Sequence, residues 1–377
     1  MRNIGVQSIG IKCQIIKEGD DIVNIVVDSV LKSTAVYNNG YDFSNDEPFY
    51  YDIDDKDIIG ITESVVARAH GCYLNINDLA TEIAEKIPSK VAVLLNPIYS
   101  RNRFSLILKA FARACNKIYI VMPEYDEVGN PRGLNPCTGV DISAYYKLLC
   151  ETENCECNII DDYYGFSKPE DVYDCGTRFY ENAYFVDCSL RPKNHPSHKY
   201  YLYTLKEFGT NVNLNYGLLG SNKANEDTLK LFPTVGDSMK VCTSIQRVIK
   251  EKINKNVEVM IYGDGCFKDA TSGIWEFADP DVSPFYTEGL DGSPNEIKLK
   301  EFADNKYANL TGDELNNAIK NEISNKKSDL VGSITSQGTT PRKYVNLLAS
   351  LMDLTSGSGD KGTPVVLVKN YFNNYSN

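Results

Sequence analysis

The stretch Asp57-Ile-Ile-Gly-Ile-Thr62-Glu-Ser-Val-Val-Ala67-Arg68-Ala-His-Gly71 joins a short apolar run directly to a helical pattern. The run that ends at Thr62 predicts a buried strand. The residues after it predict a helix that turns Val65, Val66 and Ala69 toward a core. Open α/β sheets bind ligands where such strands end, and a helix that starts there offers N–H groups to an anion. We therefore expect an α/β fold with a ligand site at this junction.

The rest of the chain alternates apolar runs with helical patterns, which indicates an α/β or α+β protein. Residues 91–205 hold a self-contained alternation, so we expect an additional α/β lobe there, inserted between two parts of a core, 1–90 and 206–377. Asp20 or Asp21 is a plausible N-cap for the first helix. The predicted strands cover 4–16, 57–62, 91–95, 117–122, 157–160, 183–188, 257–262 and 365–368, and the helical patterns cover 22–31, 63–71, 101–115, 142–150 and 344–354.

Composition excludes several classes of protein. The 39 Lys and Arg against 51 Asp and Glu give a net charge of −12, which disfavours nucleic acid and anionic membranes as partners. Hydrophobic residues at 42% are enough for a core, but no apolar run reaches the roughly 18 residues of a membrane span. The first residues lack the pattern of a signal peptide, so we expect a cytoplasmic protein.

The 11 cysteines have no framework spacing, which favours reduced thiols over disulfides. Cys150, Cys155 and Cys157, together with His195 or His198, could form a zinc site. Their spacing is not the paired type that zinc sites use. A helix end that leads into a buried strand is therefore the favoured interpretation.

Two segments pair basic side chains with the start of a helix. Ser64 and Arg68 lie one helical turn apart and could hold a phosphate, although an N-cap with a solvated Arg is the favoured interpretation of this segment taken alone. Arg101 and Arg103 follow a predicted strand, and two arginines in an acidic protein suit the carboxylate or phosphate of an acidic substrate. An ordinary surface helix start would also satisfy them.

Asp264 follows an apolar strand and lies between two glycines. A carboxylate in that setting is a typical ligand for a hard cation such as Mg²⁺, and Lys268 could neutralise a transferring phosphoryl group. A tight turn is the alternative.

Two glycine-containing turns could hold phosphates through backbone N–H groups and hydroxyls. The first spans residues 217–223 and includes Asn222, and the second spans residues 356–362. The alternatives are a common turn and a flexible linker, respectively. The chain has no GxxxxGK[ST], HExxH or GxSxG motif and only 3 His, so carboxylates, basic groups and glycine loops point to phosphoryl chemistry.

Several blocks resemble the coenzyme F420-0:L-glutamate ligases, a family of γ-glutamyl ligases. They are Ile16-Lys-Glu-Gly19-Asp20-Asp21, residues 57–71, Asn215-Tyr-Gly-Leu-Leu-Gly-Ser221-Asn222, the strand-end Asp264, and residues 348–368. Together these blocks frame residues 1–90 and 210–377. The stretch between them is longer than the family leads us to expect.

The resemblance implies a GTP-dependent ligase that uses Mg²⁺ or Mn²⁺, has an α/β fold and works as a homodimer with its site near the subunit interface. Its substrates would be a small carboxylic acid and an amino acid, glutamate. Carried over by position, Asp264 would bind metal, and the nucleotide would be held by Gln14, Ile15, Ile16, Lys17, Glu63, Ser64, Arg68, Asn222, Ser356, Gly357, Ser358, Gly359 and Asp360.

Two positions depart from the family pattern. Leu219 stands where the family has a metal-binding Asp, and Ser358 stands where it has an acidic or amide ligand. Metal binding should then be weaker, or use other residues such as Asp269 or Glu276.

Two hypotheses remain open. The first is a ligase that forms an amide through an acyl phosphate with GTP or ATP, in which Arg68 and Lys268 are catalytic and Arg101 or Arg103 binds the acid. The second is a non-catalytic paralogue that binds a nucleotide or anion without metal.

Overall fold

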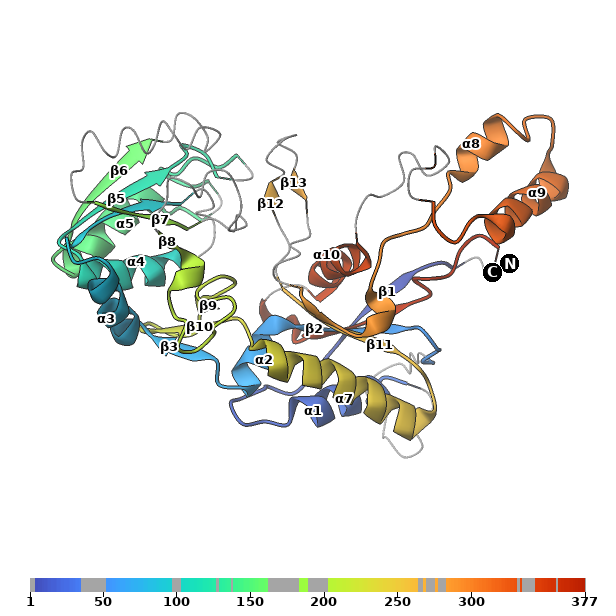
Figure 1. The fold of residues 1–377 in the computed structure, drawn as a ribbon, viewed down its shortest axis with the longest axis horizontal. Helices are drawn as coiled ribbons and strands as arrows, with labels where there is room; N and C mark the ends of the chain where they lie inside the picture. The colour runs from blue at the N-terminus through green and yellow to red at the C-terminus, as the bar shows by residue number, and fades with distance from the viewer. Residues whose placement is uncertain are drawn as a thin grey trace. The chain divides into compact units, whose positions relative to one another are not determined.

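The computed structural model describes residues 4–34, 52–96, 103–126, 129–136, 138–161, 183–188, 203–263, 267–268, 275–276, 283–330, 333, 343–356 and 359–376. The chain forms two compact units. Unit 1 comprises Met1–Val66, Gly236–Phe267 and Trp275–Asn377, and unit 2 comprises Ala67–Val235 and Lys268–Ile274. Each unit packs helices on a sheet (Figure 1), which confirms the predicted α/β (α+β) class.

Unit 1 is built on a five-stranded sheet. Its order is β1 (Gln7–Ile11), β15 (Val365–Lys369), β2 (Ile58–Thr62), β11 (Glu258–Tyr262) and β14 (Phe285–Tyr286). β2 and β11 are parallel, and the other neighbours are antiparallel. The strand predicted at 57–62 is confirmed as β2, which begins one residue later, and the first four residues of β2 are buried because it lies inside the sheet.

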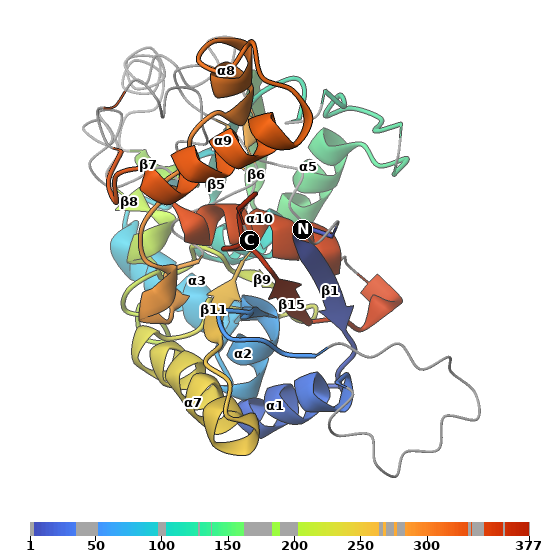
Figure 2. The ribbon, with the colours of Figure 1, turned by 90° about the vertical axis from the view of Figure 1, so that its right-hand side faces the viewer.

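Helices cover both faces of this sheet. α10 (Tyr344–Ser356) lies on one face, and α1 (Ile22–Lys32) and α7 (Val235–Ile253) lie on the other (Figures 1 and 2). Ile58, Met260 and Val366, one from each of three strands, pack with α10. Because side chains alternate along a strand, the residues next to them in sequence point to the opposite face. Asp21 caps α1, as predicted, by accepting a hydrogen bond from the Asn24 N–H at 3.1 Å.

A buried ion pair closes one edge of the sheet in unit 1. Lys369 Nζ lies 2.6 Å from Asp57 Oδ2, and both side chains are almost fully buried. Lys369 also lies 3.3 Å from Asp54. Because each buried charge needs its partner, this pair holds the amino end of β2 against the carboxyl end of β15.

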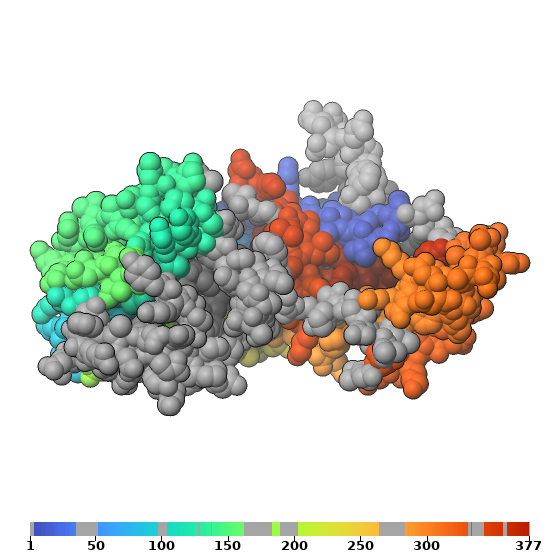
Figure 3. All heavy atoms as spheres, turned by 90° about the horizontal axis from the view of Figure 1, so that it is seen from above, coloured from blue at the N-terminus to red at the C-terminus, as the bar shows by residue number. Residues whose placement is uncertain are grey.

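Three further helical segments belong to unit 1: η4 (Glu288–Leu290), α8 (Leu299–Asp304) and α9 (Gly312–Asn325). Lys306 and Tyr307, which follow α8, both contact Glu322 on α9. This pair of helices forms an exposed part of the surface of unit 1, drawn in orange in Figure 3. Strands β12 (Phe267–Lys268) and β13 (Trp275–Glu276) pair with each other.

Unit 2 contains a fully parallel five-stranded sheet. Its order is β6 (Glu156–Asp161), β5 (Lys117–Met122), β4 (Val91–Leu95), β7 (Tyr184–Asp187) and β8 (Tyr203–Thr204). A three-stranded antiparallel sheet of β3 (Tyr73–Asn75), β10 (Thr228–Lys230) and β9 (Asn222–Lys223) and the short η3 (Leu205–Glu207) complete it. The predicted strands near 91, 117, 157 and 183 are confirmed.

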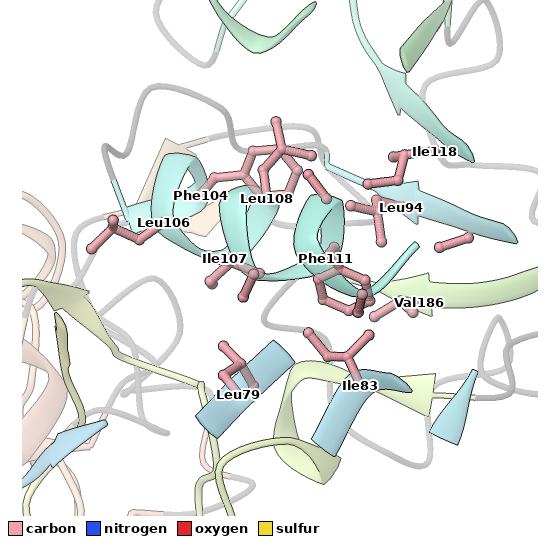
Figure 4. Close-up of a cluster of buried hydrophobic side chains, with 14 of the residues drawn as sticks. Leu79, Ile83, Leu94, Phe104, Leu106, Ile107, Leu108, Phe111, Ile118 and Val186 are labelled. Carbon is pink, nitrogen blue, oxygen red and sulfur yellow. The ribbon is translucent and has the colours of Figure 1, made fainter. Parts of the chain in front are cut away.

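Helices α3 (Ile76–Lys86), α4 (Arg103–Ala114) and α5 (Ile142–Thr152) share a buried cluster with one face of the parallel sheet. Figure 4 shows α4 with the strand residues Leu94 and Ile118 on one side and Leu79 and Ile83 of α3 on another. The predicted lobe, 91–205, lies within unit 2, whose bounds are wider. The three-part division 1–90, 91–205 and 206–377 stays a prediction.

None of the helices in the described ranges is long and apolar enough to cross a membrane.

Candidate functional site

Four strands of unit 1 bring their ends to one edge of the sheet. β2 and β11 end side by side, since Thr62 pairs with Tyr262. The first residue of β15, Val365, pairs with Ile61 on one side and with the last residue of β1, Ile11, on the other. This edge, which we call the loop edge, therefore carries the segments that follow β1, β2 and β11 and the segment that precedes β15. Ligands of open α/β sheets bind at such strand ends.

Two hydrogen bonds, one of them between backbone groups, fix the segment before β15 at the loop edge. The Thr62 N–H donates to the Pro364 carbonyl at 2.9 Å, and the Thr363 hydroxyl donates to the Ser356 carbonyl at 2.6 Å. The chain passes from α10 through η6 (Gly359–Lys361) into β15. Of the predicted nucleotide residues here, Ser356 is buried and Asp360 is exposed. Gly357 and Ser358 lie outside the described residues, and for Gly359 only the backbone is described.

Glycines 357, 359 and 362 have the G-x-G-x-x-G spacing of dinucleotide sites. Their loop follows a helix and precedes a strand, however, whereas the dinucleotide motif follows a strand and opens a helix. The spacing therefore does not indicate that motif here.

The segment after β1 runs beside this loop. The Cys13 N–H donates to the Gly362 carbonyl at 3.1 Å. Ile16 is buried and anchors the segment, while Gln14, Ile15 and Lys17 are exposed. The structure thus brings the predicted residues 14–17 and the last loop to the same edge.

Glycine makes the close approach between β1 and the last loop possible. A Cβ atom on Gly10 would lie 3.1 Å from the Cβ of Thr363.

Burial raises the pKa of the neighbouring Cys13 thiol, so this group is uncharged at neutral pH.

Glu63 and Ser64 open α2 (Glu63–Ala69) directly after β2. Glu63 is almost fully buried, and Ser64 is half-buried. The structure therefore places both at the loop edge, as the strand-to-helix junction predicted. Arg68 lies one turn further along α2 and is exposed. Val66 and Ala69 are buried, as predicted, whereas Val65 is only half-buried.

The predicted metal ligand, Asp264, lies outside the described residues, as does the alternative Asp269. The preceding Gly263 is described, and it continues β11 at the loop edge. Only the backbone is described for Lys268, on β12, and for Glu276, on β13. Across the described ranges no group of three or more His, Cys, Asp or Glu side chains could hold a metal ion.

Other predicted site residues belong to unit 2. Asn222 lies on β9 and is half-buried. Arg103 is the first residue of α4, with only its backbone described, and Arg101 lies outside the described residues. Leu219, at the position where the resemblance led us to expect a metal-binding Asp, packs against the apolar cluster of unit 2.

Cys150, Cys155 and Cys157 do not form a zinc site among the described residues. Cys150 lies in the last turns of α5 and Cys157 in β6, which confirms that a helix end leads into a strand here, but β6 is only partly buried, so the expected buried strand was wrong in that respect. His195 and His198 lie outside the described residues.

Sequence reasoning from the residues alone missed the segment after β1, which only the resemblance indicated. The pairing of β1 with β15 places this segment at the loop edge. These strands are more than 350 residues apart, so that pairing could not be predicted from neighbouring residues.

The fold and the loop edge define an α/β protein whose candidate site is assembled from both ends of the chain. The family model of F420-0:Gamma-glutamyl ligase matches residues 10–370, so the chain belongs to this family. This confirms the resemblance, and it indicates γ-glutamyl ligase-like activity on small-molecule substrates. A comparison with curated proteins gives no match.

Proposed function

We propose that this protein is a nucleotide-dependent ligase that activates a carboxylic acid as an acyl phosphate and joins it to the amine of an amino acid such as glutamate. Family membership supports the ligase class. The observation that carries the nucleotide proposal is the loop edge, where residues 14–17, Glu63, Ser64 and the loop before β15 come together. We further propose a homodimer, which the family resemblance implies.

The proposed nucleotide is GTP, with ATP as the alternative. The exposed Lys17 and Lys361 beside this edge supply positive charge for phosphates, and the exposed Ile15 offers an apolar surface to a base. Arg68, Asn222 and Lys268 remain predicted contributors.

The proposed reaction has two steps. A carboxylate oxygen of the acid attacks the γ-phosphorus, the bond to the bridging oxygen breaks, and the nucleoside diphosphate leaves. The amine nitrogen of glutamate then attacks the acyl carbon and loses a proton to water, and inorganic phosphate leaves as the carbon–oxygen bond breaks. The protein would contribute mainly positioning and electrostatic stabilisation of the phosphoryl group.

The metal proposal rests on Asp264 and is tested by Asp264→Asn. We expect this variant to lose turnover while its melting temperature stays that of the wild type, because one charge changes without a change of shape. The matched control is Asp304→Asn, on the exposed end of α8, which should keep full activity. Activity is measured as phosphate release with GTP, glutamate, a carboxylic acid and Mg²⁺ or Mn²⁺. Full turnover by Asp264→Asn would contradict the assignment.

One observation favours a second function, binding without catalysis. Leu219 is an apolar packing residue at the position of a family metal ligand. A binding protein of this kind would take up nucleotide without Mg²⁺ or Mn²⁺ and release no phosphate.

A thermal-shift titration with GTP and ATP, each with and without metal, separates the two. Ligand at about 100 times its dissociation constant stabilises a protein by roughly 2.7 kcal/mol. A shift that needs both nucleotide and metal supports the ligase, and a shift without metal supports the binding protein. No shift with either nucleotide contradicts both.

A further inference from the structure

The parallel sheet of unit 2 reverses its direction of growth beside β4. From β4 the chain adds β5 and then β6 on one side, and it then returns to place β7 and β8 on the other side of β4. The carboxyl ends of β4 and β7 are therefore neighbours at a topological switch point, with Leu95 paired to Asp187. In open parallel sheets this crevice is the place where ligands bind.

Helix α4 begins at the same edge of this sheet. The end of α4 lies at the amino edge, because the N–H of Asn116, two residues after the helix, donates to the carbonyl of Lys90, which precedes β4. The 12 residues of α4 span about 18 Å, which is enough to cross strands of five or six residues. The first turn of α4 thus lies at the carboxyl edge, where its N–H groups favour an anion.

Asn96 follows β4 directly and carries an unsatisfied group. Its side chain is 2% exposed, and its Nδ2 atom has no hydrogen-bond partner in the described part of the chain. Ala92 and Leu94 belong to the cluster that packs on α4 (Figure 4), so Asn96, two residues further on, points to the same face, toward the start of α4. A buried amide without a partner costs free energy, and a ligand acceptor would remove that cost.

Asp187 ends β7 on the other side of the switch point and is fully buried. Phe185 belongs to the cluster on the opposite face of the sheet, so by alternation Asp187 points to that face. Asn96 therefore lies on one face of the sheet at the strand ends and offers a hydrogen-bond donor. Asp187 lies on the other face and offers a carboxylate that accepts from hydroxyl groups.

We propose that unit 2 binds a phosphorylated small molecule that also carries hydroxyl groups at the carboxyl ends of β4 and β7. The phosphate accepts a hydrogen bond from Asn96 Nδ2 at the start of α4, and a hydroxyl group donates to Asp187. This site uses none of the residues at the loop edge. Its test is a binding measurement, so the result does not depend on whether the ligase proposal holds.

The test is calorimetric titration of the full chain with ribose 5-phosphate, inorganic phosphate and uncharged ribose. We expect ribose 5-phosphate to bind most tightly, because it can use both groups. Asn96→Leu should lower the affinity for ribose 5-phosphate and for inorganic phosphate by about tenfold or more, the usual effect of losing a hydrogen bond to a charged group. The matched control is Asn116→Leu, the same substitution at the exposed, opposite edge of the sheet.

A second variant keeps the shape of the site. Asp187→Asn should lower the affinity for ribose 5-phosphate but leave the affinity for inorganic phosphate unchanged. Without ligand, Asn96→Leu should melt at the wild-type temperature or above it, since it removes an unsatisfied group. Absence of binding by all three probes would overturn the proposal, as would equal affinity of Asn96→Leu and wild type.

Discussion

Cys157 has the most reactive environment among the described thiols with a shifted pKa. A hydrogen bond from the thiol of Cys150 lowers the pKa of Cys157 below its ordinary value of 9. A hydrogen bond with Cys155, then the contact with Cys157, and then burial raise the pKa of Cys150. Burial raises the pKa of Cys115 and of Cys242 to about 12. Because the thiolate is the nucleophile, these residues should differ in reactivity.

We predict that iodoacetamide modifies Cys157 before Cys115 and Cys242, at pH values below 9 where these two described cysteines are still thiols. Cys157 is also partly exposed, whereas the other two are buried. Replacing Cys150 by Ala removes the hydrogen bond, so the pH midpoint of Cys157 labelling should rise toward 9. Peptide mass spectrometry across a pH series gives the order. Earlier labelling of Cys242, or an unchanged midpoint in Cys150→Ala, would contradict the assigned contact.

At the scale of elements, α10 packs closely on β2 because Gly60 has no side chain. A Cβ atom on Gly60 would lie 2.1 Å from the Sδ atom of Met352, which is fully buried on α10. The helix is thereby held close to the sheet, and its end at Ser356 leads into the loop that the Thr62–Pro364 hydrogen bond fixes at the loop edge.

We predict that Gly60→Ala lowers the free energy of unfolding by about 1–3 kcal/mol, the usual cost of overpacking. Met352→Ala should cost about 2–5 kcal/mol through its cavity. The double variant should be about as stable as Met352→Ala alone, since the new methyl group then has room. Urea unfolding of the three variants measures this coupling. Additive losses would show that Met352 does not limit the space at Gly60.

The elements also show what the sequence could and could not predict. The strand at 58–62 was predictable because an unbroken apolar run is typical of a buried strand. α7 was not predicted, although its buried positions have helical spacing, because the polar Ser238 stands at one of the buried positions of its first turns. α9 was not predicted either, since only Ile319 and Ile323 of its 14 residues are buried.

The candidate site could be predicted only in part. The strand-to-helix junction at Glu63 and Ser64 followed from local pattern, because it depends on adjacent residues. The approach of residues 14–17 and the last loop depends on the pairing of β1 with β15, and the register of strands so far apart leaves no local trace.

At the scale of the whole molecule, β1 provides an argument for the proposed homodimer. In the described part of the sheet of unit 1, β1 has a neighbouring strand on one side only. Exposed apolar side chains accompany this edge: Ile4 is 63% exposed, Val6 is 50% exposed, and Ile15 is 77% exposed. An unpaired strand edge with apolar side chains is a template for another chain.

We therefore predict that the protein elutes as a dimer through this edge, with a mass of about twice 42.2 kDa by light scattering. Val6→Lys should shift the mass toward one chain at micromolar concentration, because a charge would then enter the apolar contact. Leu214→Lys is the matched control, since Leu214 is 80% exposed in unit 2 and should leave the mass unchanged. A wild-type protein with the mass of one chain would refute the dimer, whereas a dimer that Val6→Lys leaves intact would place the interface elsewhere and refute the role of β1.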